Sequence, residues 1–202
     1  MKKSNLVALI SLVALTSGAC GNDNKAGGQS TATTPMVTHP SVAVSVSPAP
    51  AQQNNTGRPA VTFDPCVDVG DSTIQKMGFD PMTRKRGDMT AETYTFLGCD
   101  FEHKNNDGRT DWMLTLMATN ITMSEVRSKY KDTVANTSIA GHDAVTYTLS
   151  TEATGDTCFL AMDSPVGVLD LQLDRNPVRA SGEPCDRIRE IAQTLQEDLP
   201  KK

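Results

Sequence analysis

A predicted β-hairpin over residues 158–173 constrains the fold of this chain more than any other stretch. Its second half has the period-2 pattern of a strand with one buried face: Leu169, Asp170, Leu171, Gln172 and Leu173. Residues 163–167 supply the turn, Asp-Ser-Pro-Val-Gly. Cys158 begins the hairpin, and Cys185 lies at the start of an amphipathic helix that follows it. A disulfide between them would join helix to sheet.

Turn and cap signals place the other elements around this hairpin. Asp64 and Pro65 favour the start of a short helix, and Thr122 with Glu125 forms a capping box ahead of a second one. Alternating apolar residues predict three further strands, at 94–101, 112–118 and 145–149. We therefore expect an α+β domain, a single antiparallel sheet of about five strands covered by two or three helices, in the order α-β-β-α-β-β-β-α.

The N-terminus has the pattern of a secretory signal peptide. Lys2 and Lys3 precede an apolar run at residues 6–15, and small residues follow it as far as Cys20. The run has about half of the ~20 residues that a membrane-spanning helix needs. We predict that residues 1–19 are a signal peptide that directs export.

Cys20 is the predicted site of a lipid anchor. The sequence Ser17-Gly-Ala-Cys20 resembles a bacterial lipobox, in which the cysteine receives a diacylglycerol, with fatty acids such as palmitate, before cleavage. The chain has 5 cysteines, and lipidation of this one leaves an even set of four. We expect the protein on the extracytoplasmic face of the cell membrane. The alternative is a secreted soluble protein without a lipid anchor, cleaved after Ala19.

A change in composition separates this anchor from the folded domain. Residues 20–62 are rich in Ser, Thr and Pro and contain no aromatic residue upstream of Phe63. Such a segment buries too little apolar surface to offset its ordering entropy, so we predict a disordered tether. The globular α+β domain is expected over residues 63–202.

The four remaining cysteines, Cys66, Cys99, Cys158 and Cys185, are expected to form two disulfides in an oxidising compartment. Four cysteines allow three pairings, and sequence order alone does not choose among them. We favour Cys66 with Cys99 and Cys158 with Cys185, because each pair joins a helix start to a strand of the same helix-on-sheet layer.

Three motifs in the globular part resemble a family of actinobacterial cell-envelope lipoproteins that contain a domain of unknown function. They are Phe63-Asp-Pro-Cys66, Gly98-Cys99 with a nearby aromatic residue, and a closing helix from Cys185-x-x-Ile188 to Leu199-Pro200. Asp100-Phe101 stands where the family commonly has Arg-Trp. The resemblance implies an envelope location and a disulfide-bonded domain, and it implies no known reaction.

Candidate catalytic and metal-binding residues have simpler readings. His142 and Asp143 are neighbours in a predicted strand and therefore point to opposite faces. Asn105, Asp107 and Asp111 alternate like a calcium loop but lack its closing Glu, and an Asp-Gly turn explains them. The sequence has neither a G-x-S-x-G elbow nor a glycine-rich phosphate loop. We therefore predict no catalytic residue, metal or cofactor.

The net charge of the chain limits the classes of partner that it can bind. The formal net charge of −5 argues against nucleic acid, whose phosphates need clustered Lys and Arg. One basic run, Arg84-Lys-Arg86, could contact an anionic headgroup or wall polymer, although a solvated loop explains it as well. We expect a non-enzymatic binding or accessory module that takes another exported protein or an amphiphile between sheet and helix. The alternatives are an envelope enzyme acting on a wall or lipid substrate and a structural spacer.

The Cys20→Ala substitution tests the lipid anchor. It should release the protein from membranes or block its maturation, because this acidic chain has no basic cluster next to the anchor that could hold it there. Detergent partition of the wild type and the variant measures the change. Unchanged membrane retention of the variant would contradict the prediction.

Overall fold

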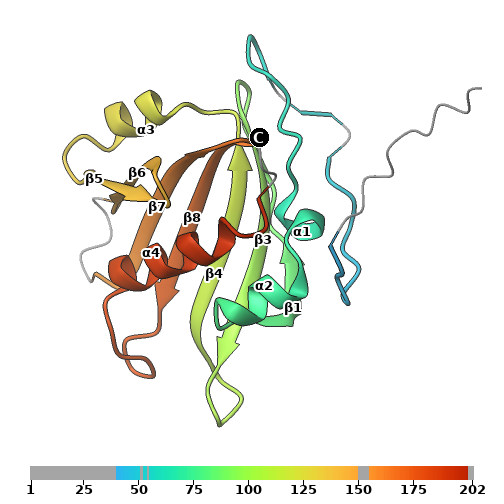
Figure 1. The fold of residues 1–202 in the computed structure, drawn as a ribbon, viewed down its shortest axis with the longest axis vertical. Helices are drawn as coiled ribbons and strands as arrows, with labels where there is room; N and C mark the ends of the chain where they lie inside the picture. Colours follow the sequence, from blue (N-terminus) through green and yellow to red (C-terminus); the bar gives the residue numbers. More distant parts are fainter. Residues whose placement is uncertain (1–39, 51, 54, 150–154, 200–202) are drawn as a thin grey trace, which may run out of the picture. The chain divides into compact units, whose positions relative to one another are not determined.

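The computed structural model describes residues 40–50, 52–53, 55–149 and 155–199. Its strands are β1 (Asp80–Arg86), β2 (Met89–Thr90), β3 (Thr95–Lys104), β4 (Thr110–Thr119), β5 (Ala135–Ile139), β6 (His142–Tyr147), β7 (Thr157–Ser164) and β8 (Gly167–Arg175). Its helices are α1 (Pro65–Asp68), α2 (Asp71–Lys76), α3 (Met123–Lys129) and α4 (Pro184–Leu195). All strand pairs are antiparallel, and the sheet order is β1-β3-β4-β8-β7-β6-β5, with β2 also paired to β3 (Figure 1).

The fold prediction was wrong in its strand number and its balance of elements. The described residues form mostly one eight-stranded sheet with four helices, not about five strands covered by two or three helices. The strands β1, β2 and β5 were not predicted. β1 and β5 lie at the two ends of the sheet order, where one side of a strand has no neighbour and a polar sequence is tolerated. Their sequences, DPMTRKR and ANTSI, lack the apolar alternation on which the prediction relied.

The predicted hairpin at 158–173 is confirmed as β7 and β8, with Ser164 opposite Gly167 at the turn. β8 also pairs along its whole length with β4, from Trp112 opposite Arg175 to Thr119 opposite Val168. The last strand of the chain therefore lies in the middle of the sheet. It joins the β3–β4 hairpin to the strands that follow α3.

Both faces of the central strands are buried. In β7, Leu160 and Met162 belong to the large core under α4, whereas Phe159 and Ala161 belong to a second apolar cluster with α3. Alternate residues of a strand point to opposite faces, so the two helices cover opposite faces of the sheet. We call these the α4 face and the α3 face. A single apolar face had been expected.

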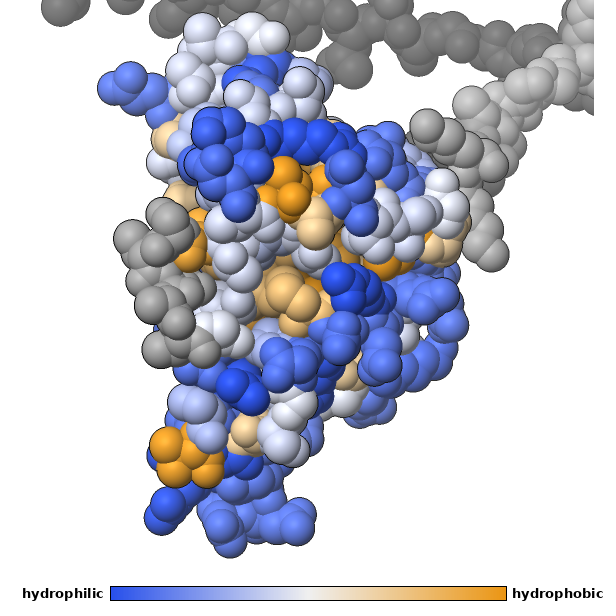
Figure 2. Space-filling view, turned by 90° about the vertical axis from the view of Figure 1, so that its left-hand side faces the viewer, coloured by the Kyte–Doolittle hydropathy of each residue, from blue (hydrophilic) through white to orange (hydrophobic). Residues whose placement is uncertain are grey.

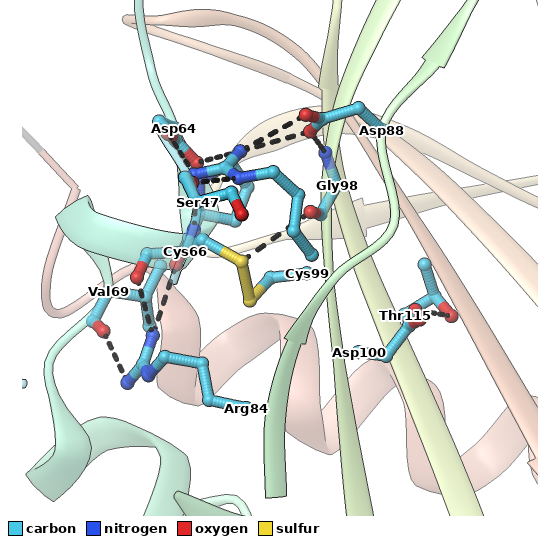
Figure 3. Close-up of a disulfide and its surroundings, with 12 residues drawn as sticks. Ser47, Asp64, Cys66, Val69, Arg84, Asp88, Gly98, Cys99, Asp100 and Thr115 are labelled. Atoms are coloured by element: carbon cyan, nitrogen blue, oxygen red, sulfur yellow. Dashed lines mark hydrogen bonds and ion pairs between the residues drawn. A yellow bond between two sulfur atoms is a disulfide. The ribbon is translucent and has the colours of Figure 1, made fainter. Parts of the chain in front are cut away.

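Two disulfides join helices to strands. Cys66 of α1 is bonded to Cys99 of β3, with the two Cα atoms 5.1 Å apart (Figure 3). Cys158 of β7 is bonded to Cys185 of α4, with a Cα separation of 5.2 Å. These are the two pairs that the sequence analysis favoured. Both bonds lie on the α4 face, since all four cysteines are part of the large core or packed against it.

Residues that precede Phe63 also contact the domain. The sequence analysis had placed the start of the domain at Phe63. The backbone amide of Ala43 donates to a carboxylate oxygen of Asp71 at 2.6 Å, and Val46 packs against the large core. Val61 is itself part of that core. The described part of the predicted tether therefore includes residues that lie against the domain.

Loss of either disulfide should destabilise the domain strongly. The bonds span 33 and 27 residues, and loop-closure entropy gives about 3.5 kcal/mol for each. We expect Cys66→Ala/Cys99→Ala and Cys158→Ala/Cys185→Ala each to lower the free energy of unfolding by about that amount. Urea unfolding under oxidising conditions measures the change. An unfolding free energy equal to that of the wild type would refute the expectation for that bond.

Candidate functional site

A pocket of about 530 Å³ opens between α3 and the sheet on the α3 face. Rings and methionine side chains form most of its apolar wall: Met89, Tyr94, Phe96, Met117, Tyr130 and Phe159. They come from β2, β3, β4, β7, the C-terminal end of α3 and the segment between β2 and β3. On the side of the molecule that carries α3, apolar atoms lie in a hollow surrounded by hydrophilic residues (Figure 2).

Helix α3 is fixed over the sheet at its first turn. The predicted capping box is confirmed: the Thr122 hydroxyl accepts from the Glu125 amide, and the Glu125 carboxylate accepts from the Thr122 amide at 2.8 Å. Arg58 donates through both terminal nitrogens to the same carboxylate, at 2.9 and 2.5 Å. These contacts, with Arg58 as the largest cause, lower the pKa of Glu125 to about 2. Arg58 and Glu125 thus form a neutral ion pair at the pocket rim.

Three rings stack against one another in the pocket wall. Tyr130 lies on Tyr147 with ring centroids 4.1 Å apart, and Tyr147 lies on Phe159 at 5.1 Å. The ammonium group of Lys129 lies over the outer ring, 5.1 Å from the centroid of Tyr130. The stack therefore runs from the end of α3 into the sheet.

A buried carboxyl lies beside this stack. Asp170 of β8 is 4% exposed, and the Tyr147 hydroxyl donates to its two oxygens at 3.0 and 2.9 Å. Burial raises the pKa of Asp170 to about 7, and the Tyr147 hydrogen bond and the charge of Lys129 oppose that rise. Burial, followed by the Asp170 charge, raises the pKa of Tyr147 as well, so its hydroxyl stays protonated.

The sequence analysis read Asp170 as a solvent-facing residue, and that interpretation was wrong. Asp170 lies directly opposite Ala161 of β7 and Met117 of β4, on the face that α3 covers. The signal was present in the sequence. Residues 158–162 are apolar at both phases of the alternation, which is the pattern of a strand buried on both faces.

The candidate catalytic and metal-binding residues of the sequence analysis are not brought together by the fold, whereas the four disulfide cysteines are. Cys20 and His39 lie outside the described residues. Asp143 pairs with Arg127 at 2.6 Å, and His103 bonds Asp111 at 2.5 Å. In the candidate calcium loop, the Asn105 side chain accepts from the backbone amides of the hairpin turn. Across the described ranges, no three His, Cys, Asp or Glu side chains are grouped to hold a metal ion.

The basic run at 84–86 is a strand with internal partners, not a solvated loop. The guanidinium of Arg84 donates to the carbonyls of Cys66 and Val69, each at 3.1 Å (Figure 3). It also donates to Asp71 at 2.7 Å. Arg86 pairs with Asp64 and Asp88. Arg84 and Arg86 are therefore paired within the domain, and their charges are not free to bind an anionic surface.

Comparisons with known proteins give one match. The family model described as "Protein of unknown function (DUF3558)" matches residues 15–197 of the chain. Neither a curated protein nor a solved structure matches the chain.

Asp170→Asn should change how stability depends on pH. In the unfolded chain the carboxyl loses its proton near pH ~4, and in the folded protein near pH 7. Between these values the folded state binds more protons, so ionisation of Asp170 lowers the free energy of unfolding as pH rises from about 4 to about 7. Asparagine cannot ionise. The stability of the variant relative to the wild type should therefore rise across that range and level off above it.

Urea unfolding at several pH values from 4 to 8 measures this difference. The matched control is Asp163→Asn, an exposed carboxyl at the end of β7 in the same hairpin. A difference between Asp170→Asn and wild type that stays constant with pH would show that Asp170 titrates as it does in the unfolded chain.

Proposed function

Because the chain belongs to the DUF3558 family of proteins of unknown function, we propose that it is an exported, lipid-anchored binding module of the cell envelope. Its ligand site is the pocket beneath α3. The resemblance to actinobacterial envelope lipoproteins supports the location. The matched span begins at residue 15 and so includes Cys20, the proposed site of the anchor.

The pocket itself carries the proposal of binding. Its volume of about 530 Å³ lies within the range of about 300–1,000 Å³ typical of small-molecule sites. Its wall combines stacked rings and methionines with one buried carboxyl, and charged side chains lie at the rim. Apolar lining with a few placed polar groups is characteristic of ligand pockets. An amphiphile matches this arrangement, because its apolar part would cover the rings.

We propose binding and not turnover. A general acid or base must reach the reacting atoms of its substrate. Asp170 lies in the pocket wall, and the hydroxyl of Tyr147 already bonds both of its oxygens. Its ordered hydrogen bonds fit a fixed recognition group better than a group that exchanges protons with a substrate.

The proposed location agrees with the presence of two disulfides in the domain. Its disulfides persist in oxidising compartments, although they support export only weakly. Within the described ranges, no helix has the length and apolar character that a membrane crossing requires. In the proposal, attachment to the membrane comes from acyl chains on Cys20.

Filling the pocket should abolish ligand binding. We expect N-phenyl-1-naphthylamine, an uncharged probe that fluoresces in apolar surroundings, to bind the full chain saturably. The chain would carry Cys20→Ala so that no acyl chain competes for the pocket. In that background, Met117→Trp should remove saturable binding, because Met117 of β4 lines the pocket.

Met113→Trp is the matched control. Met113 lies four residues away on β4 and on the same face, but it is 40% exposed and is not part of the pocket. Circular dichroism would verify that both variants fold. Equal probe binding in the two variants, or no saturable binding in the parent chain, would overturn the proposed function.

A further inference from the structure

We infer that the pocket selects amphiphiles with a cationic head, and that Asp170 receives the ammonium group. This inference rests on the proposed function and names its ligand class. It depends on the buried carboxyl of β8, its hydrogen bonds and the rings around it.

Asp170 lacks a full counter-charge. Among the described residues, the Tyr147 hydroxyl is the one side-chain donor to Asp170, and Lys129 acts on it through its charge without forming an ion pair. Arg58, the nearby guanidinium at the rim, is already paired with Glu125. A buried carboxylate is costly unless a cation compensates it. A ligand ammonium would supply the missing charge and hydrogen-bond donors.

The rings next to Asp170 also favour a cation. Stacked aromatic rings carry negative charge on their faces, and cations are attracted to them. The protein's own Lys129 already lies over the outermost ring of the stack. Lys129 is solvent-exposed at the end of α3, so an arriving cation could displace it into water.

A neutral or anionic head fits less well. An uncharged head would leave Asp170 as poorly compensated as it is in the free protein. A carboxylate head would meet a like charge in surroundings that screen it weakly. The only nearby positive groups are Lys129, which is exposed, and Arg58, which is neutralised by Glu125, among the pocket residues that the structure describes.

Displacement of the naphthylamine probe by three dodecyl compounds tests the head-group preference. The full Cys20→Ala chain would be titrated at pH 8 with dodecylamine, dodecanol and dodecanoate, each below its micelle concentration. Dodecylammonium should bind about tenfold or more tightly than dodecanol, and dodecanoate most weakly. In Asp170→Asn the advantage of the ammonium over dodecanol should vanish. Asp163→Asn controls for general attraction to an acidic chain.

A calorimetric measurement on the unmutated pocket covers the case in which Asp170→Asn does not fold. The titratable and charged groups around Asp170 are Tyr147 from β6, and Tyr130, Lys129 and the Glu125–Arg58 pair at α3. At pH 6 the buried carboxyl is largely protonated, so ammonium binding should release a proton. Calorimetric titrations in two buffers of different ionisation enthalpy measure the number of protons released. Dodecanol should release none.

The outcomes separate the two proposals. Saturable probe binding with equal affinity for all three head groups overturns the cationic preference and leaves the pocket as a ligand site. An ammonium advantage that persists in Asp170→Asn, or binding without proton release at pH 6, also overturns it. Failure of the probe to bind in the parent chain overturns both.

Discussion

The pairing of β8 with β4 is the constraint on which the rest of the structure depends. It joins the β3–β4 hairpin to the β7–β8 hairpin, so each half of the sheet is held by the other. A strand in that position has hydrogen-bonded neighbours on both sides and helices over both faces. Residues 168–171 are therefore buried on both faces, and this is why Asp170 cannot face solvent.

The sequence predicted the elements whose signals are local. The β7–β8 hairpin, the β3–β4 hairpin, the capping box at Thr122 and the Asp64 cap of α1 are all present. Each depends on residues within a few positions of one another. The same local signals placed each cysteine at a helix start or in a strand, and the two favoured disulfide pairs followed from those positions.

The elements that were missed depend on long-range partners. β1 contains Arg84 and Lys85 and looks like a loop until α1 supplies the carbonyls that satisfy Arg84. β5 is polar because it lies at the edge of the sheet. The alternation of Leu and polar residues in β8 predicts that Asp170 is exposed. Asp170 is buried because α3 covers the second face of the sheet. Local patterns describe one strand at a time, whereas the candidate site is made by α3 together with β2, β3, β4, β6, β7 and β8.

The two faces of the sheet also differ in how freely they can evolve. Both disulfides lie on the α4 face, where they hold the fold together covalently. The α3 face has no such bond among its described residues, and a substitution there removes noncovalent contacts alone. A stability reserve held on one face lets residues on the other change without crossing the threshold for folding. Relatives that share this arrangement can therefore diverge in sequence on the α3 face while keeping the same scaffold.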